Sequence, residues 1–252
     1  MTSHAALAAA ATLVSLAFAA CTAERWFDRR RPHELAWTLA LVLFAAGAAA
    51  LWWGAAAGWG ELSFRLFYAF GAVVNVPVLA LGTVLLLSRP RVGRAATAAV
   101  ALLGAFALGV VLAAPMHGTI DPHALPQGSE VFGPLPRVLA AVGSGLGATI
   151  LLGGAVWSAA RLRSRGGPPR LVVANLLIAL GTLLLSAGGL LNAAVDEMDG
   201  FAISLVAGIS VIFVGFLLST PRPPARRAVL APPAALPTSE RVPANAPGEP
   251  VA

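Results

Sequence analysis

Residues 35–57 read LAWTLALVLFAAGAAALWWGAAA, 23 positions without a charged side chain, and Arg29, Arg30 and Arg31 come shortly before them. About 20 apolar residues in a helix cross the hydrocarbon of a bilayer, where the backbone must pair its own hydrogen-bonding groups. Arginine is costly in hydrocarbon and is retained on the cytoplasmic side. This stretch is therefore predicted to span a membrane, and the arginines before it indicate its direction.

Six further stretches have the same apolar character. The mean hydropathy is +0.81 and 11% of the residues are charged, whereas soluble domains carry about 25% charged residues. The sequence therefore predicts an all-α integral membrane protein, a bundle of seven transmembrane helices. The predicted spans are residues 5–23, 35–57, 64–87, 95–114, 135–159, 171–195 and 201–219.

The arginines alternate between the segments that connect these spans. Segments after the first, third, fifth and seventh spans are rich in arginine, while the opposite segments are acidic and hold Arg65 and Arg137. The positive-inside rule then places the N-terminus outside and the C-terminus in the cytoplasm. The orienting residues are Arg25, Arg29, Arg30, Arg31, Arg89, Arg91, Arg94, Arg161, Arg163, Arg165, Arg170, Arg222, Arg226 and Arg227.

The net charge of +6 does not predict a nucleic-acid partner, because the arginines lie in short segments between apolar stretches. The predicted partner is the lipid bilayer, together with another membrane protein or a second copy of the chain. All 17 basic residues are arginine, and Ala, Gly and Pro are frequent, as in GC-rich bacteria. The expected location is the bacterial plasma membrane.

Both ends of the chain need separate interpretation. Phe18 to Cys21 approximates a lipoprotein cleavage box, but cleavage would invert the later segments and no basic residue precedes the apolar stretch, so we predict a retained span. Nine prolines occur among the 33 residues 220–252, which are expected to be a disordered cytoplasmic tail. The predicted domains are thus a seven-helix domain of residues 1–219 and this tail.

Aromatic residues favour the level of the lipid headgroups. Trp59, Phe64 and Tyr68 stand at predicted outer ends of spans, where we expect them to face that level. Trp52 and Trp53 lie deeper and are interpreted as packing between helices.

Polar residues inside spans are candidate ligand positions, since they are costly in hydrocarbon. Asn75 lies two residues before Pro77, which removes a backbone hydrogen bond and predicts a kink, either for packing or for gating. Asn175 and Asn192 lie in the sixth span. Residues 179–185 echo residues 80–86 of the third span, which is the pattern of an inverted three-plus-three repeat or a coincidence of composition.

The outer segments hold charged residues that could bind ions. Arg65 and Arg137 stand at outer helix ends, where each could pair with an acid or hold an anion. His117, Asp121, His123, Glu130, Asp196, Glu197 and Asp199 could ligate a divalent metal, but their spacing matches no metal-ligand motif. We predict solvated loops and no metal site.

No catalytic residue or cofactor is predicted. The segment Gly143-Ser144-Gly145 resembles the serine motif of rhomboid proteases, yet no histidine follows His123 to act as its base. The histidines lie at span ends or in loops, which excludes a pair of haem ligands within the spans, and the absence of lysine excludes a retinal Schiff base. Gly143 and Gly147 have the spacing that permits close helix packing.

Residues 29–87, with an arginine-rich segment, a Trp37-bearing span and FRLFYAFG at 64–71, resemble uncharacterised multi-pass proteins of GC-rich bacteria. In layout the chain is also similar to the seven-span sensor module of some bacterial histidine kinases. The resemblance to the uncharacterised proteins implies no activity. Because no catalytic constellation lies in any span or loop, we predict a non-enzymatic sensor-like or accessory membrane module. The alternative is a small-molecule transporter with an inverted repeat.

The topology is testable with the single cysteine of the chain. Cys21 is replaced by Ala, and cysteines are introduced singly at Ser129, Ser164 and Glu240. An impermeant maleimide should label intact cells at position 129 alone, because the other two positions follow arginine-rich segments. Labelling at 164 or 240 without permeabilisation would overturn the predicted orientation.

Overall fold

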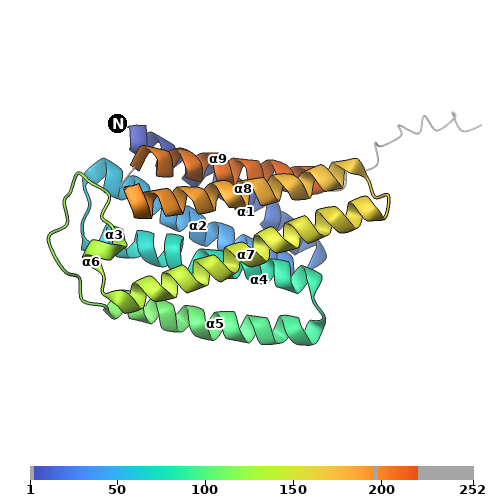
Figure 1. Ribbon diagram of the computed structural model, residues 1–252, viewed down its shortest axis with the longest axis horizontal. Helices are drawn as coiled ribbons and strands as arrows, with labels where there is room; N and C mark the ends of the chain where they lie inside the picture. The colour runs from blue at the N-terminus through green and yellow to red at the C-terminus, as the bar shows by residue number, and fades with distance from the viewer. Residues whose placement is uncertain (1–2, 196–197, 221–252) are drawn as a thin grey trace, which may run out of the picture. The chain divides into compact units, whose positions relative to one another are not determined.

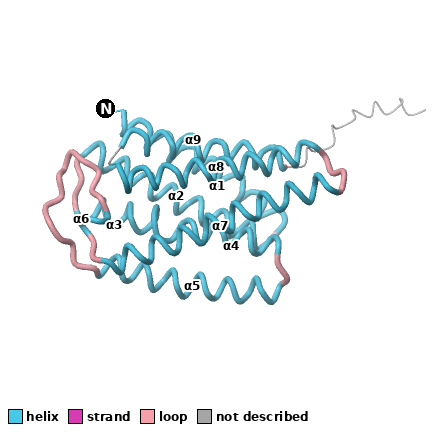
Figure 2. Tube along the Cα trace, in the orientation of Figure 1, coloured by secondary structure: helices cyan, strands magenta, loops and turns pink. Residues whose placement is uncertain are grey.

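The computed structural model describes residues 3–195 and 198–220, and the regular elements within them are helices (Figure 1, Figure 2). Seven helices of this part are long and apolar enough to cross a membrane, which confirms the predicted number of spans. They are α1 (Ser3–Arg29), α2 (Pro32–Ala57), the continuous segment of α3 (Glu61–Phe67), η1 (Tyr68–Val74) and α4 (Asn75–Leu87), α5 (Pro90–Ala113), α7 (Pro134–Ser164), α8 (Pro169–Val195) and α9 (Met198–Ser219). The chain is thus a multi-pass membrane protein, and its predicted tail lies outside the described residues apart from Thr220.

Prolines begin the helices that follow the arginine-bearing segments. Pro32 and Pro90 occupy the first turns of α2 and α5, where a missing amide hydrogen removes no helical bond. The preceding residues are extended, with ψ of 128° at Arg31 and 152° at Arg89. The helices continue beyond the apolar stretches into the arginine-bearing segments. The predicted boundaries at 23 and 159 were therefore too early, since α1 ends at Arg29 and α7 ends at Ser164.

Six spans form a closed ring, in which α1 packs on α2, α2 on α4, α4 on α7, α7 on α8, α8 on α9, and α9 on α1. The fourth span, α5, packs against the outside of this ring on α4, η1 and α7. Only 11% of α5 is buried, compared with 39% of α1. An inverted three-plus-three repeat would make α1 and α5 equivalent, and their unlike surroundings give that repeat no support.

The connecting segments give the two ends of the ring different character. The α1–α2, α4–α5 and α7–α8 connections and the end of α9 lie at one end, on the right in Figure 1, and we name it the arginine end. The opposite end carries α3, the single-turn helix α6 (Gly128–Val131) and the long segment 114–133, and we name it the loop end.

Aromatic side chains fill the loop end. Trp59 is 4% exposed and Phe64 is fully buried, and the Phe64 ring stacks on Phe132 with centroids 5.5 Å apart. The backbone amide of Trp59 also donates to the carbonyl of Pro122, 3.0 Å away, so segment 114–133 folds over these rings. Trp59 and Phe64 thus lie at the end of the spans where they were predicted, but they are buried beneath segment 114–133 and are not exposed to the headgroups.

Trp52 and Trp53 show the opposite deviation, since each is 44% exposed. The face of α2 that packs inward carries Leu51 and Gly54, and this leaves the two tryptophans on its outer side. The expectation that they pack between helices was wrong.

Glycine brings helix backbones into contact at the centre of the ring. A Cβ atom at Gly47 of α2 would lie 2.9 Å from the backbone nitrogen of Gly71 in η1. On α7, a Cβ at Gly147 would lie 2.8 Å from Val76, and one at Gly143 would lie 3.3 Å from Pro77. The predicted close packing through Gly143 and Gly147 is confirmed, and it fixes α7 against the third span.

Candidate functional site

A buried carboxylate lies at the arginine end. Glu34 stands in the first turn of α2, and 1% of its side chain is exposed. Its Oε1 lies 3.3 Å from both Nε and Nη2 of Arg25, near the end of α1. Arg30, with φ of 52°, adopts the left-handed conformation that often ends a helix, and the resulting short connection brings α1 and α2 together.

The partners of this pair come from a third helix as well. The guanidinium carbon of Arg25 lies 4.6 Å from the ring centroid of Phe216 on α9. Its Nη1 lies 3.5 Å from the hydroxyl of Thr220, directly after the end of α9. Arg25 therefore connects the start of α2 to the end of α9 by a charge pair, a cation–π contact and a hydrogen bond.

Hydroxyl groups complete the junction between α1 and α2. The Thr38 hydroxyl donates to the backbone carbonyl of Glu34 at 2.8 Å and lies 3.0 Å from the hydroxyl of Thr22. Thr22 is 1% exposed, and its own hydroxyl donates to the carbonyl of Ala19 at 2.9 Å. The two helices are thus joined by polar contacts below the arginine-bearing surface.

The carboxylate of Glu34 is only partly satisfied. Its Oε2 is buried and has no hydrogen-bond partner among the described residues. A buried acceptor left unpaired costs about 1–3 kcal/mol. The first turn of a helix favours a negative charge, which offsets part of this cost. Glutamate is almost never fully buried unless it is paired, and this one also has an unpaired oxygen, so we take the Arg25–Glu34 pair as the candidate site.

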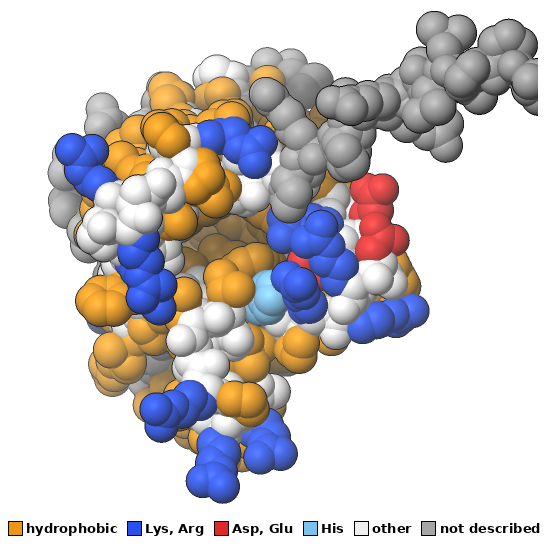
Figure 3. Space-filling view, turned by 90° about the vertical axis from the view of Figure 1, so that its right-hand side faces the viewer, with side chains coloured by type: hydrophobic (Ala, Val, Ile, Leu, Met, Phe, Trp, Pro, Cys, Tyr) orange, Lys and Arg blue, Asp and Glu red, His pale blue; other side chains and the backbone are white. Residues whose placement is uncertain are grey.

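The surface above this pair is basic. Figure 3 views the arginine end and shows arginine side chains around a hollow with an apolar wall, with a histidine and acidic side chains on one side of it. His33 precedes Glu34, and its ring lies 5.2 Å from that of Trp37 in an edge-on arrangement. Trp37 in turn lies directly against Gly82 of α4. The first turns of α2 are therefore held from both α1 and α4.

Sequence reasoning did not single out Glu34. The available signal was an acid within the arginine-rich segment, one residue before an apolar stretch of 23 positions. Arg25 was noted only as an orienting charge. The nine-residue spacing between them matches no helical repeat, and the pair becomes visible only once the turn at Arg30 is known.

Arg65 holds backbone rather than an acid. Its Nη1 donates to the carbonyl oxygens of Val111 at 2.8 Å and Leu112 at 3.2 Å, at the C-terminal end of α5. These carbonyls have no helical partner and carry partial negative charge, so a guanidinium is well suited to them. Arg137 is exposed in the first turn of α7. Neither residue is placed in a shared ligand site.

Pro77 produces a π-helical segment rather than the simple kink that was predicted. Proline lacks the amide hydrogen that would bond the preceding turn, and η1 covers the seven residues Tyr68–Val74 just before it. Two freed carbonyls find side-chain donors, as Asn75 Nδ2 donates to Gly71 at 3.4 Å and the Ser144 hydroxyl donates to Ala72. This bonding across to α7 is what a packing role requires.

Asn75 and Asn175, the intramembrane asparagines whose side chains the structure describes, do not converge. Asn75 bonds within its own segment, and Asn175 Nδ2 donates to the carbonyl of Leu171 in its own helix at 2.8 Å. Asn192 lies in α8, and its side chain is outside the described part. Asn75 and Asn175 therefore form no common polar site, which the transporter alternative would require.

The outer segment 114–133 carries exposed polar residues. His117, Asp121, His123 and Glu130 are all exposed, and the backbone amide of His123 donates to Asp121 Oδ1 at 2.8 Å. Among the described residues no group of three or more His, Cys, Asp or Glu side chains is placed to hold a metal ion. Asp196 and Glu197 lie outside those residues.

Comparison of the chain with models of protein families, with curated proteins and with solved structures finds no match.

A double-substitution cycle tests the pair. Arg25→Met leaves a buried carboxylate without its counter-ion and should lower the free energy of unfolding by about 3–5 kcal/mol. Arg25→Met combined with Glu34→Met removes both charges and should restore most of this loss. The measurement is reversible unfolding in mixed micelles.

The matched control is Arg29→Met, which removes an exposed charge from the same segment and should change the free energy of unfolding by less than about 0.5 kcal/mol. Purely additive losses in the double variant would contradict a buried charge pair.

Proposed function

We propose that this protein is a non-enzymatic, sensor-like or accessory module of the bacterial plasma membrane, with its N-terminus outside and its C-terminus in the cytoplasm. The seven apolar spans support membrane insertion, and the gathering of arginines at one end supports this orientation. Its partner is a membrane protein or a second copy of the chain.

The observation that carries the proposal is the position of the Arg25–Glu34 pair. It joins the α1–α2 hairpin to the end of α9 and to Thr220, the last residue that the structure describes. Opening the pair would change the contacts of Arg25 with Phe216 and Thr220 at the end of α9. Phe18 of α1 would remain packed against Phe213 and Phe216. The Arg25–Glu34 contact has two states, formed and broken. A partner or a membrane signal can shift the equilibrium between them.

The energies of the pair suit a switch. The stabilisation from Arg25 is opposed by the cost of the unpaired Oε2, so the closed state is favoured by a modest margin. A ligand or partner that binds the open state with about 100-fold preference shifts such an equilibrium by about 2.7 kcal/mol. In this proposal the polar junction serves to transmit a change and performs no chemistry.

Affinity capture tests the role. Tagged native chain, Arg25→Met and Arg29→Met are each isolated from membranes in mild detergent, and the masses and stoichiometries of the complexes are compared. The native chain should recover one membrane protein or a second copy in fixed ratio, because the module acts through a partner. Recovery should change several-fold with Arg25→Met and remain native with Arg29→Met.

Two results would sink the proposal. One is turnover of a lipid or peptide substrate by the purified chain. The other is partner recovery that is the same for the native chain and Arg25→Met, measured on folded, monodisperse protein.

A further inference from the structure

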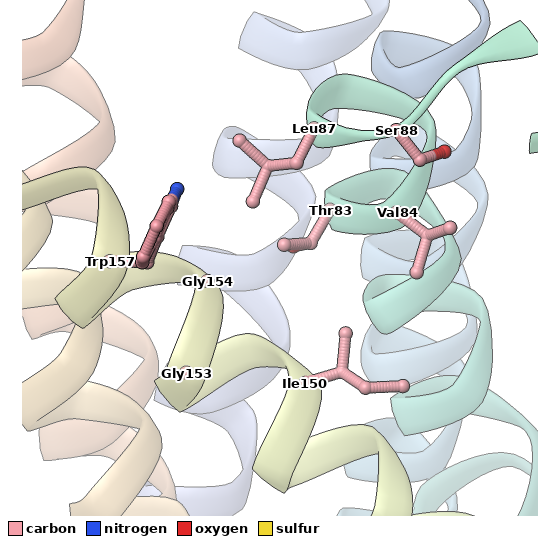
Figure 4. Close-up of a pocket in the computed structure, with 8 residues that line it drawn as sticks. All are labelled: Thr83, Val84, Leu87, Ser88, Ile150, Gly153, Gly154 and Trp157. Carbon is pink, nitrogen blue, oxygen red and sulfur yellow. The ribbon is translucent and has the colours of Figure 1, made fainter. Parts of the chain in front are cut away.

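A groove separate from the charge pair runs between α4 and α7 near the arginine end. Its volume is about 340 Å³. Figure 4 shows Thr83 and Leu87 of α4 directed toward α7, with Trp157 on the opposite side. The lining residues are Thr83, Val84, Leu87, Ser88, Ile150, Gly153, Gly154 and Trp157.

Glycine sets the depth of this groove. A Cβ atom at Gly154 would lie 2.6 Å from Cγ2 of Thr83, so the two helices are in contact there. A Cβ at the adjacent Gly153 would meet nothing within 4 Å. The groove is therefore the open flank of a tight helix contact and is not filled by side chains of the described chain.

The groove faces the surroundings of the ring. Trp157 is 63% exposed, Leu87 is 48% exposed and Ile150 is 41% exposed. The residues of α7 that pack toward its ring neighbours, Leu151, Ala155 and Ala159, are buried on a different face of the same helix. In a membrane an exposed apolar groove contacts lipid, so a hydrocarbon chain is its natural occupant.

Positive charge stands at the mouth of the groove. Arg161 follows Trp157 by four residues and Gly154 by seven, which places it on the same face of α7. A helical side chain covers the turn N-terminal to its own Cα, so Arg161 extends back over Trp157. Arg89 directly follows the lining residue Ser88. Both arginines are exposed.

We propose that this groove binds one anionic phospholipid, with an acyl chain between Leu87 and Trp157 and the phosphate headgroup at Arg89 and Arg161. The apolar lining fits the chain, and the two arginines are complementary to the charge of the headgroup. Trp157 occupies the boundary between the two, where its ring is apolar and its indole N–H can bond a headgroup oxygen. The site does not depend on the proposed signalling role.

Brominated lipids test the site through the fluorescence of Trp157. The protein is reconstituted in phosphatidylcholine vesicles that contain a small, equal fraction of brominated phosphatidylglycerol or brominated phosphatidylcholine. The Trp157 signal is taken as the difference between the native chain and Trp157→Phe. Brominated phosphatidylglycerol should quench this signal at a several-fold lower fraction, because each arginine near a headgroup contributes about fivefold in affinity.

Two sets of variants separate charge from shape. Arg89→Gln with Arg161→Gln should abolish the preference for phosphatidylglycerol, while Arg165→Gln, which removes an exposed charge from the α7–α8 connection, should retain it. Gly153→Leu fills the groove without changing any charge, and it should reduce quenching by both lipids. Equal quenching by the two lipids in the native chain, or a preference that survives the Arg89 and Arg161 substitutions, would refute the site.

Discussion

A carboxylate that is buried in an apolar bundle requires a counter-ion. The counter-ion of Glu34 makes many of the polar contacts at the arginine end. Arg25 supplies that charge from α1 and also contacts Phe216 and Thr220 at the end of α9. The pair therefore brings together helices that are neighbours in sequence and one that is far away. Removing Arg25 alone leaves the carboxylate of Glu34 buried without its counter-ion, so the two residues are expected to act as a unit.

Different interactions hold the two ends of the ring together. This difference determines at which end we place the proposed switch. At the loop end, Phe64 and Phe132 stack beneath a folded connecting segment, and Arg65 is bonded to carbonyls of α5. Apolar packing of this kind is not reversed by one charge. At the arginine end Phe18 also packs against two phenylalanine rings of α9, but the polar contacts between α1, α2 and the end of α9 centre on Arg25, whose partner Glu34 has an unpaired oxygen. The proposed switch is therefore placed in these polar contacts.

Much of the fold could be predicted from the sequence, because helices that cross lipid must be long and apolar. Length and hydropathy give the seven spans, and the spacing of Gly143 and Gly147 gives the packing of α7. The site was not predictable in the same way. Glu34 and Arg25 meet only because Arg30 turns the chain, and the burial of Trp59 depends on a loop whose path hydropathy does not encode. Asn75 and Asn175 suggested function but bond within their own helical segments.

The central claim is that Glu34 is an ionised partner of Arg25, and infrared difference spectroscopy measures this directly. Spectra of the native chain and of Glu34→Gln are recorded in the same membranes with uniform isotope labelling of glutamate. The native spectrum should contain a carboxylate band that Glu34→Gln removes, and Arg25→Met should change the frequency of this band, because the guanidinium no longer contacts Oε1. If Glu34→Gln instead removes the band of a protonated carboxyl group, Glu34 is not ionised in the native chain and the charge pair is contradicted.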